Sequence, residues 1–128
     1  MRKHIEGSFD VTVSPVSAAG EPLMRMSIDK RFAGELDATS VGQMMAGGVE
    51  ANGARVYVAL ETVTGTLCGR RGSFLLVHRG TMTRTAQELT VTVAPDSGTG
   101  ELAGLSGEMA IDVVEKKHHY VFDFALPD

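Results

Sequence analysis

The chain has only one cysteine, Cys68, among its 128 residues, so it cannot form a disulfide within itself. It also lacks any spacing of cysteine and histidine that would build a zinc site. A lone cysteine without a disulfide framework favours a reducing compartment. We therefore expect a cytoplasmic protein that binds neither a metal nor a cofactor.

Long apolar runs and long basic runs are missing as well. The basic start, Met1-Arg-Lys-His4, is followed by alternating polar and apolar residues and not by the apolar core of a secretory signal. No apolar segment reaches membrane-spanning length, which predicts a soluble protein without a membrane partner. The formal net charge is −4, and no run of lysine and arginine exceeds two residues, so we expect no nucleic acid partner.

What the chain does have is alternation of apolar and polar residues. Hydrophobic residues make up 43% and charged residues 22%, which is typical of a globular protein, and the length fits one domain over residues 1–128. The alternation has a period of two, and no window shows a convincing helical period. The sequence therefore predicts an all-β protein.

We expect about eight strands, and this number is enough to close a small antiparallel barrel without exposed sheet edges. A β-sandwich is the alternative. One short helical turn is expected near residues 100–105, where Leu102 and Leu105 would plug one end of the barrel. The strands are expected near residues 4–14, 23–33, 36–46, 57–68, 71–80, 88–94, 109–113 and 120–124.

Glu61 and His78 are the two residues of greatest interest. Gly69-Arg70 resembles a glycine-first hairpin turn, and a hairpin closed by this turn sets Glu61 directly opposite His78 on a face that is otherwise apolar. A carboxylate and an imidazole in such surroundings titrate as a coupled pair. One hypothesis makes them the catalytic residues of an isomerase or cyclase, with Glu61 as base or charge stabiliser and His78 holding it or relaying the proton. The other makes them a structural hydrogen bond that fixes the strand register.

Further candidates for ligand binding share the inward faces of their strands. Lys30 is one, although its ammonium could instead reach water near the strand end. With a loop at 33–35 it would face Ala38, and with a two-residue loop it would face Asp37; the first register keeps Leu36 inside. The remaining candidates are three aromatic residues, Tyr57, Phe74 and Phe122.

Two neighbouring histidines, His118 and His119, point to opposite faces of a strand. Their rings therefore cannot chelate one metal ion together. We expect both at the surface, near a hairpin turn.

Four segments carry a family resemblance: residues 34–42, 57–61, 69–82 and 95–107, of which the last is the most specific. Together they resemble a bacterial family, domain of unknown function 3224, over nearly the whole chain. The resemblance implies a small antiparallel barrel of the allene oxide cyclase type, a fold shared with plant allene oxide cyclases and dirigent proteins. Both of these relatives steer the cyclisation or coupling of apolar molecules.

The resemblance thus implies a small apolar ligand inside the barrel, and we expect Glu61 and His78 at the polar end of its cavity. A filled barrel that acts as a structural or interaction module is the alternative. Barrels of this type associate through their outer walls, so we also expect a homo-oligomer, a dimer or a trimer. The outward residues that would bury this contact are Val56, Val58, Leu60, Leu75 and Val77.

Overall fold

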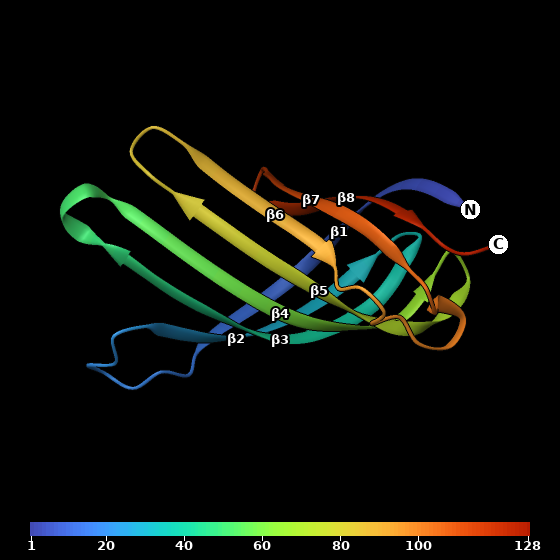
Figure 1. Ribbon diagram of the computed structural model, residues 1–128, viewed down its shortest axis with the longest axis horizontal. Coiled ribbons are helices and arrows are strands. Elements are labelled where there is room, and N and C mark those ends of the chain that lie inside the picture. The colour runs from blue at the N-terminus through green and yellow to red at the C-terminus, as the bar shows by residue number, and fades with distance from the viewer.

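The eight strands form one closed antiparallel barrel in which each strand pairs with the next and β8 returns to β1 (Figure 1). The computed structural model describes the backbone of residues 1–128 and the side chains of residues 1–48 and 51–128. This architecture confirms the all-β barrel that the alternation predicts. The elements are β1 (Arg2–Pro15), β2 (Met24–Ala33), β3 (Leu36–Val49), η1 (Glu50–Asn52), β4 (Ala54–Leu67), β5 (Arg70–Met82), β6 (Gln87–Val93), η2 (Gly100–Leu102), β7 (Ser106–Val114) and β8 (Lys117–Ala125).

One end of the barrel is closed by side chains. The short helix η2 brings Leu102 into the interior and Leu105 follows it, with 1% and 2% of their surfaces exposed, which confirms the predicted plug. Both chain termini lie at this end (Figure 1), where the backbone of Met1 and Leu126 exchanges hydrogen bonds of 2.8 Å. The hydrophobic core therefore occupies this half of the barrel, and its largest fully buried members are Tyr120, Phe32, Phe74, Phe122, Leu36, Leu67 and Leu76.

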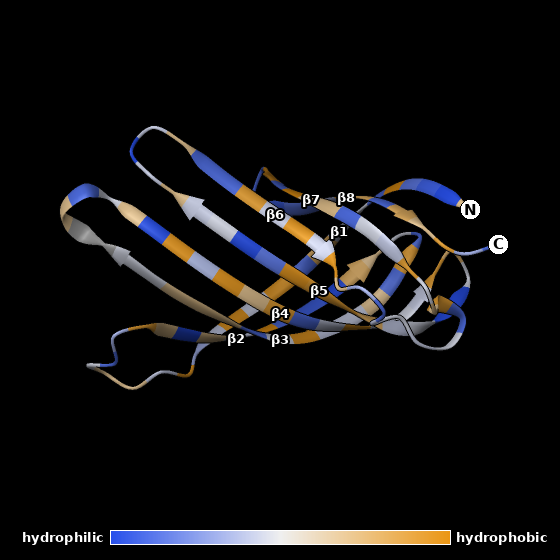
Figure 2. Ribbon diagram, viewed as in Figure 1, coloured by the Kyte–Doolittle hydropathy of each residue, from blue (hydrophilic) through white to orange (hydrophobic). Residues whose placement is uncertain are grey.

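The opposite end is open, and it is formed by the loops that join β1 to β2, β3 to β4, β5 to β6 and β7 to β8 (Figure 1). Hydrophobic and hydrophilic residues follow one another along β4 as it approaches this end (Figure 2). The seam between β6 and β7 is short, with only two register pairs, Val91 with Met109 and Thr92 with Glu108. No helix in the described part of the chain is long and apolar enough to cross a membrane.

The β4–β5 turn differs from the predicted one. Cys68 and Gly69 have φ angles of 50° and 81°, as a type I′ turn requires, and Leu67 pairs with Arg70. Glu61 consequently lies opposite Leu76 and not opposite His78. The turn lies one residue before the predicted Gly69-Arg70, so the predicted register is wrong by two residues. An even shift keeps every side chain on the same face, so the hydrophobic pattern fits both registers equally well.

The β2–β3 register is also shifted. Lys30 lies opposite Ser40, so both of its predicted partners, Ala38 and Asp37, are wrong. The preferred alternative had the correct face, because the difference is again two residues, and Leu36 is buried as expected. The observed register matters for the site, because it places the hydroxyl group of Ser40 opposite Lys30.

Candidate functional site

A buried network of four polar side chains spans four neighbouring strands of the barrel, β2 to β5. Oε2 of Glu61 accepts hydrogen bonds from Lys30 Nζ at 2.9 Å and from His78 Nε2 at 2.6 Å. Oε1 accepts a hydrogen bond from Ser40 Oγ at 2.9 Å. His78 reaches Glu61 diagonally, since it lies two residues beyond the residue opposite Glu61, a separation that long side chains can bridge. Glu61 is thus the centre of the network.

Small residues on β3 make room for this network. Lys30 is on β2 and Glu61 is on β4, so the lysine side chain must pass over β3 inside the barrel. There it meets Ser40 directly opposite, and Gly42 lies opposite Glu61. A Cβ atom on Gly42 would lie 2.2 Å from the Leu60 carbonyl oxygen and 2.7 Å from the Glu61 Cα. A side chain at this position would therefore collide with the strand that carries the glutamate.

The ionisation of Glu61 follows from its surroundings. The residue is 1% exposed, and burial alone raises the pKa of a carboxyl group. The hydrogen bond from His78 and the charge of Lys30 outweigh burial and lower the pKa of Glu61 from 4.5 to about 2. Glu61 is therefore a carboxylate at neutral pH. A carboxylate with so low a pKa, and with both oxygens already bonded, is a weak proton acceptor.

Lys30 is held inside the barrel. Its Nζ lies 4.9 Å from the ring centre of Phe9 and 5.8 Å from that of Phe32, within the range of a cation–π interaction. Only 6% of its side-chain surface is exposed. The sequence left open that the ammonium reaches bulk water, and the structure excludes this alternative.

The network lies beneath a pocket of about 190 Å³ at the open end of the barrel. Lys30 and His78 face the pocket, whereas Glu61 and Ser40 lie behind them and do not line it. Tyr57 belongs to the rim, where its ring covers Gly80 so closely that a Cβ there would be 2.2 Å from the ring. The other lining residues are mostly apolar: Phe9, Val11, Val13, Ile28, Met44, Ala59, Leu89, Ile111 and His118.

The structure brings four of the six predicted site residues together. Glu61 is bonded to both His78 and Lys30, and Tyr57 shares the pocket with the last two. Phe74 and Phe122 lie elsewhere. Their rings stack in the core of the closed half, with centroids 6.0 Å apart, and they do not line the pocket.

Sequence reasoning missed two residues of this region, Ser40 and His118. Ser40 is a polar residue among small inward residues on β3, and this is a signal that the sequence does offer. His118 was expected at the surface, but its ring lies against that of Phe9 in the wall of the pocket, with the ring centroids 5.1 Å apart. Its neighbour His119 faces outward, as the strand alternation predicted.

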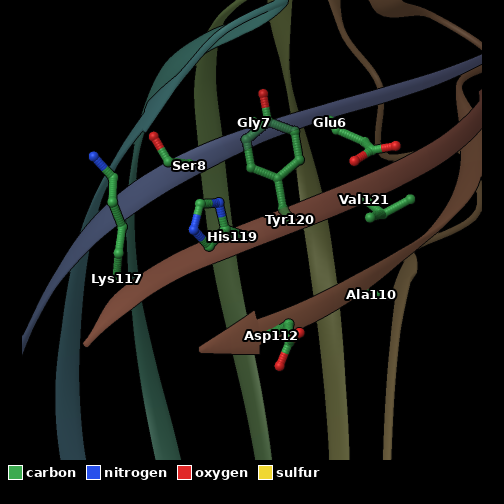
Figure 3. Close-up of a pocket in the computed structure, with 9 residues that line it drawn as sticks. All are labelled: Glu6, Gly7, Ser8, Ala110, Asp112, Lys117, His119, Tyr120 and Val121. Atoms are coloured by element: carbon green, nitrogen blue, oxygen red, sulfur yellow. The ribbon is translucent and has the colours of Figure 1, made fainter. Parts of the chain in front are cut away.

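A larger hollow, of about 620 Å³, lies on the outer wall of β1, β7 and β8 (Figure 3). Its charged side chains, Glu6, Asp112 and Lys117, are exposed to solvent, and none of the buried network reaches it. Charged groups that stay in water have little effect on one another. The larger volume of this hollow therefore does not make it the better candidate for the functional site. Among the described side chains, no three His, Cys, Asp or Glu residues gather closely enough to hold a metal ion.

A closed antiparallel barrel with a solid core in one half and a Lys–Glu–His network under a pocket in the other places the chain in the class of small antiparallel β-barrels. The chain belongs to the family described as protein of unknown function (DUF3224), whose model matches residues 5–124. A solved structure of a DUF3224 protein of unknown function from Shewanella oneidensis MR-1 is similar over 100% of this chain and 99% of that one. The two share 42% sequence identity with a TM-score of 0.91. No protein with a curated description matches this chain.

Proposed function

We propose that this barrel binds a small, mainly apolar molecule in the pocket at its open end. The observation that carries the proposal is an apolar pocket whose floor presents two polar side chains, Lys30 and His78, held in place by one buried carboxylate. Apolar walls with a few fixed polar groups are typical of ligand sites. The volume of about 190 Å³ is below the roughly 300–1,000 Å³ of pockets for drug-sized ligands, so the ligand is a single ring or a short chain.

Proton transfer, as an isomerase or cyclase would use it, is the catalytic form of this proposal. In this form of the proposal, Glu61 and His78 have different roles. His78 faces the pocket and can touch a substrate, whereas Glu61 is covered by Lys30 and His78. Glu61 then acts as the charge that positions His78 through the hydrogen bond to Nε2, and His78 is the acid or base.

Ligand binding is expected to raise the thermal unfolding temperature of the protein. At a ligand concentration of 100 times Kd the stabilisation is about 2.7 kcal/mol, which is several degrees for a domain of this size. The measurement is a thermal shift with a panel of single-ring and short-chain compounds. If no compound of the panel changes the thermal unfolding temperature of the folded protein, the alternative is favoured. In that case the barrel has no ligand and its function lies on its surface.

A blocking variant and a matched control locate the binding. Leu89 lines the pocket from β6 and is 42% exposed, so Leu89→Trp fills the pocket without disturbing the core. Thr90 is the next residue on the same strand and points to the outer side. The ligand shift should disappear in Leu89→Trp and persist in Thr90→Trp. Equal shifts in both variants would place the ligand elsewhere.

We also propose that the protein is a homo-oligomer, a dimer or a trimer, which buries the outer wall of β3, β4 and β5. This wall carries large apolar side chains that the single chain leaves in water: Val41 is 62% exposed, Leu60 56% and Val58 50%. Contiguous exposed apolar residues are typical of protein interfaces. Burial of the same surface in two copies would remove it from water.

The oligomer is tested by the molar mass in solution, measured by light scattering during gel filtration. The wild type should have two or three times the mass of the chain, and Leu60→Glu should have the mass of one chain, because it places a charge in the interface. Val113→Glu is the matched control, since Val113 is 55% exposed on β7, outside this wall. A wild type with the mass of one chain contradicts the proposal.

A further inference from the structure

The polar atom that the barrel offers to a ligand is Nδ1 of His78. The other ring nitrogen, Nε2, is bonded to Glu61, and Nδ1 has no hydrogen-bond partner among the described residues. No buried polar side-chain atom among them lacks a partner, so Nδ1 is in contact with solvent. His78 is 5% exposed and lines the pocket, and the solvent that reaches Nδ1 is therefore the solvent of the pocket.

The bond to Glu61 also determines which nitrogen carries the proton. Glu61 is ionised and can only accept hydrogen bonds, so Nε2, at 2.6 Å from its oxygen, must be the donor. In neutral His78 the proton is then on Nε2, and Nδ1 presents a lone pair to the pocket. An apolar pocket whose floor ends in a proton acceptor is complementary to an apolar molecule with a proton donor.

The charges of the network decide what kind of donor fits. Lys30 and Glu61 cancel each other, so the network is neutral while His78 is neutral. If a ligand O–H bond breaks, its electron pair stays on the oxygen and the proton forms an N–H bond at Nδ1. The network then has a charge of +1 beside an oxyanion of −1. Tyr57 and His118 are the other titratable residues of the pocket, and burial raises the pKa of Tyr57, which keeps its hydroxyl neutral.

We infer that the ligand is a small, weakly acidic hydroxyl compound, a monocyclic phenol or an enol of the same size, whose hydroxyl group donates to His78 Nδ1. This inference rests on the proposed function and specifies its ligand class. A carboxylic acid fits less well, because at neutral pH it is already an anion and has no proton to give to the lone pair. A hydrocarbon of the same size would displace the solvent at Nδ1 and leave this nitrogen without a hydrogen-bond partner, which costs affinity.

The test compares four ligands of nearly equal size: phenol, anisole, toluene and benzoate. Their dissociation constants are measured by calorimetry on the wild type, on His78→Gln and on the pocket-filling Leu89→Trp. Phenol should bind the wild type at least 10-fold more tightly than anisole or toluene. His78→Gln should remove this preference but still bind toluene, and Leu89→Trp should bind none of the four.

The possible failures are distinct. Equal affinity for phenol, anisole and toluene would overturn the hydroxyl inference and leave the proposed pocket intact. Tighter binding of benzoate than of phenol would overturn it in favour of an anion site. Absence of binding by all four to the folded wild type would contradict the proposed function for ligands of this size, and the inference with it.

A measurement without ligand tests which ring nitrogen of His78 carries the proton. Nitrogen chemical shifts of the His78 ring in its neutral form should show a protonated Nε2 and an unprotonated Nδ1, and a proton on Nδ1 of the neutral ring would overturn the inference. A second optical measurement follows the proton. Bound 4-nitrophenol should show a larger fraction of the phenolate absorption band than free 4-nitrophenol at the same pH, and this excess should vanish in His78→Gln.

Discussion

Replacement of Glu61 by glutamine is expected to lower the free energy of unfolding by about 3–5 kcal/mol, the usual cost of removing one partner from a buried ion pair. Glutamine has nearly the same volume, so the loss comes from charge and not from a cavity. Without the carboxylate, the ammonium of Lys30 has no counter-charge, and only 6% of its side chain is exposed. His78 loses a hydrogen bond of 2.6 Å at the same time. Urea unfolding at neutral pH measures the effect.

The matched control for this variant is Glu88→Gln, because Glu88 is an exposed carboxylate on the neighbouring wall of the barrel, in β6. A substitution at such a surface position should change the free energy of unfolding by no more than about 0.5 kcal/mol. The double variant Lys30→Met, Glu61→Gln should be less unstable than the sum of the two single variants, since it leaves no unpaired charge. A loss below about 1 kcal/mol in Glu61→Gln would show that the network is not the stabilising ion pair described above.

Acid is expected to destabilise the protein through the same residue. The pKa of Glu61 is lowered from 4.5 to about 2 in the folded state, so unfolding releases the glutamate to its ordinary pKa. The unfolded state then binds more protons than the folded state below about pH 4.5. The stabilisation is fully present above this pH and is lost as the pH falls towards 2. A difference of this size corresponds to on the order of 3 kcal/mol.

Unfolding curves between pH 6 and pH 2 separate this contribution from those of the other carboxylates. The wild type should lose stability more steeply than Glu61→Gln between about pH 4.5 and pH 2, and the two curves should converge at the acid end. Glu88→Gln should follow the wild type throughout. Parallel curves for the wild type and Glu61→Gln would show that the carboxyl group of Glu61 has an ordinary pKa.

The face of each predicted strand could be deduced from the sequence, but its register could not. Period-two alternation places Glu61, His78 and Lys30 inside, and all three are inside. Both hairpins that join them are shifted by two residues from the predicted pairing, and a shift of two leaves every face unchanged. Turn geometry decides between such registers. In β4–β5 the glycine is the second turn residue, after Cys68, whose φ is 50°.

The site was only partly predictable, because its parts meet through the closure of the barrel. Lys30 bonds Glu61 across an intervening strand, and no local pattern indicates that a side chain of β2 reaches one of β4. His118 enters the pocket because β8 pairs with β1 and brings it beside Phe9. Contacts of this kind depend on the number of strands and on the way the sheet curls. A hydrophobic pattern does not encode these properties.

The division of the barrel into a solid half and an open half has a consequence for its evolution. The residues that hold the fold together lie around Phe74, Phe122 and the plug of Leu102, while several of those that line the pocket, among them Val13, Tyr57 and Leu89, are exposed or half-buried. Substitutions among the latter cost less stability, because they leave no large cavity in the core. Lys30, Glu61 and His78 lie at the border between the halves. Substitutions at the open end are therefore expected to be tolerated more readily than substitutions in the closed half, so that the lining of the pocket can change while the fold is kept.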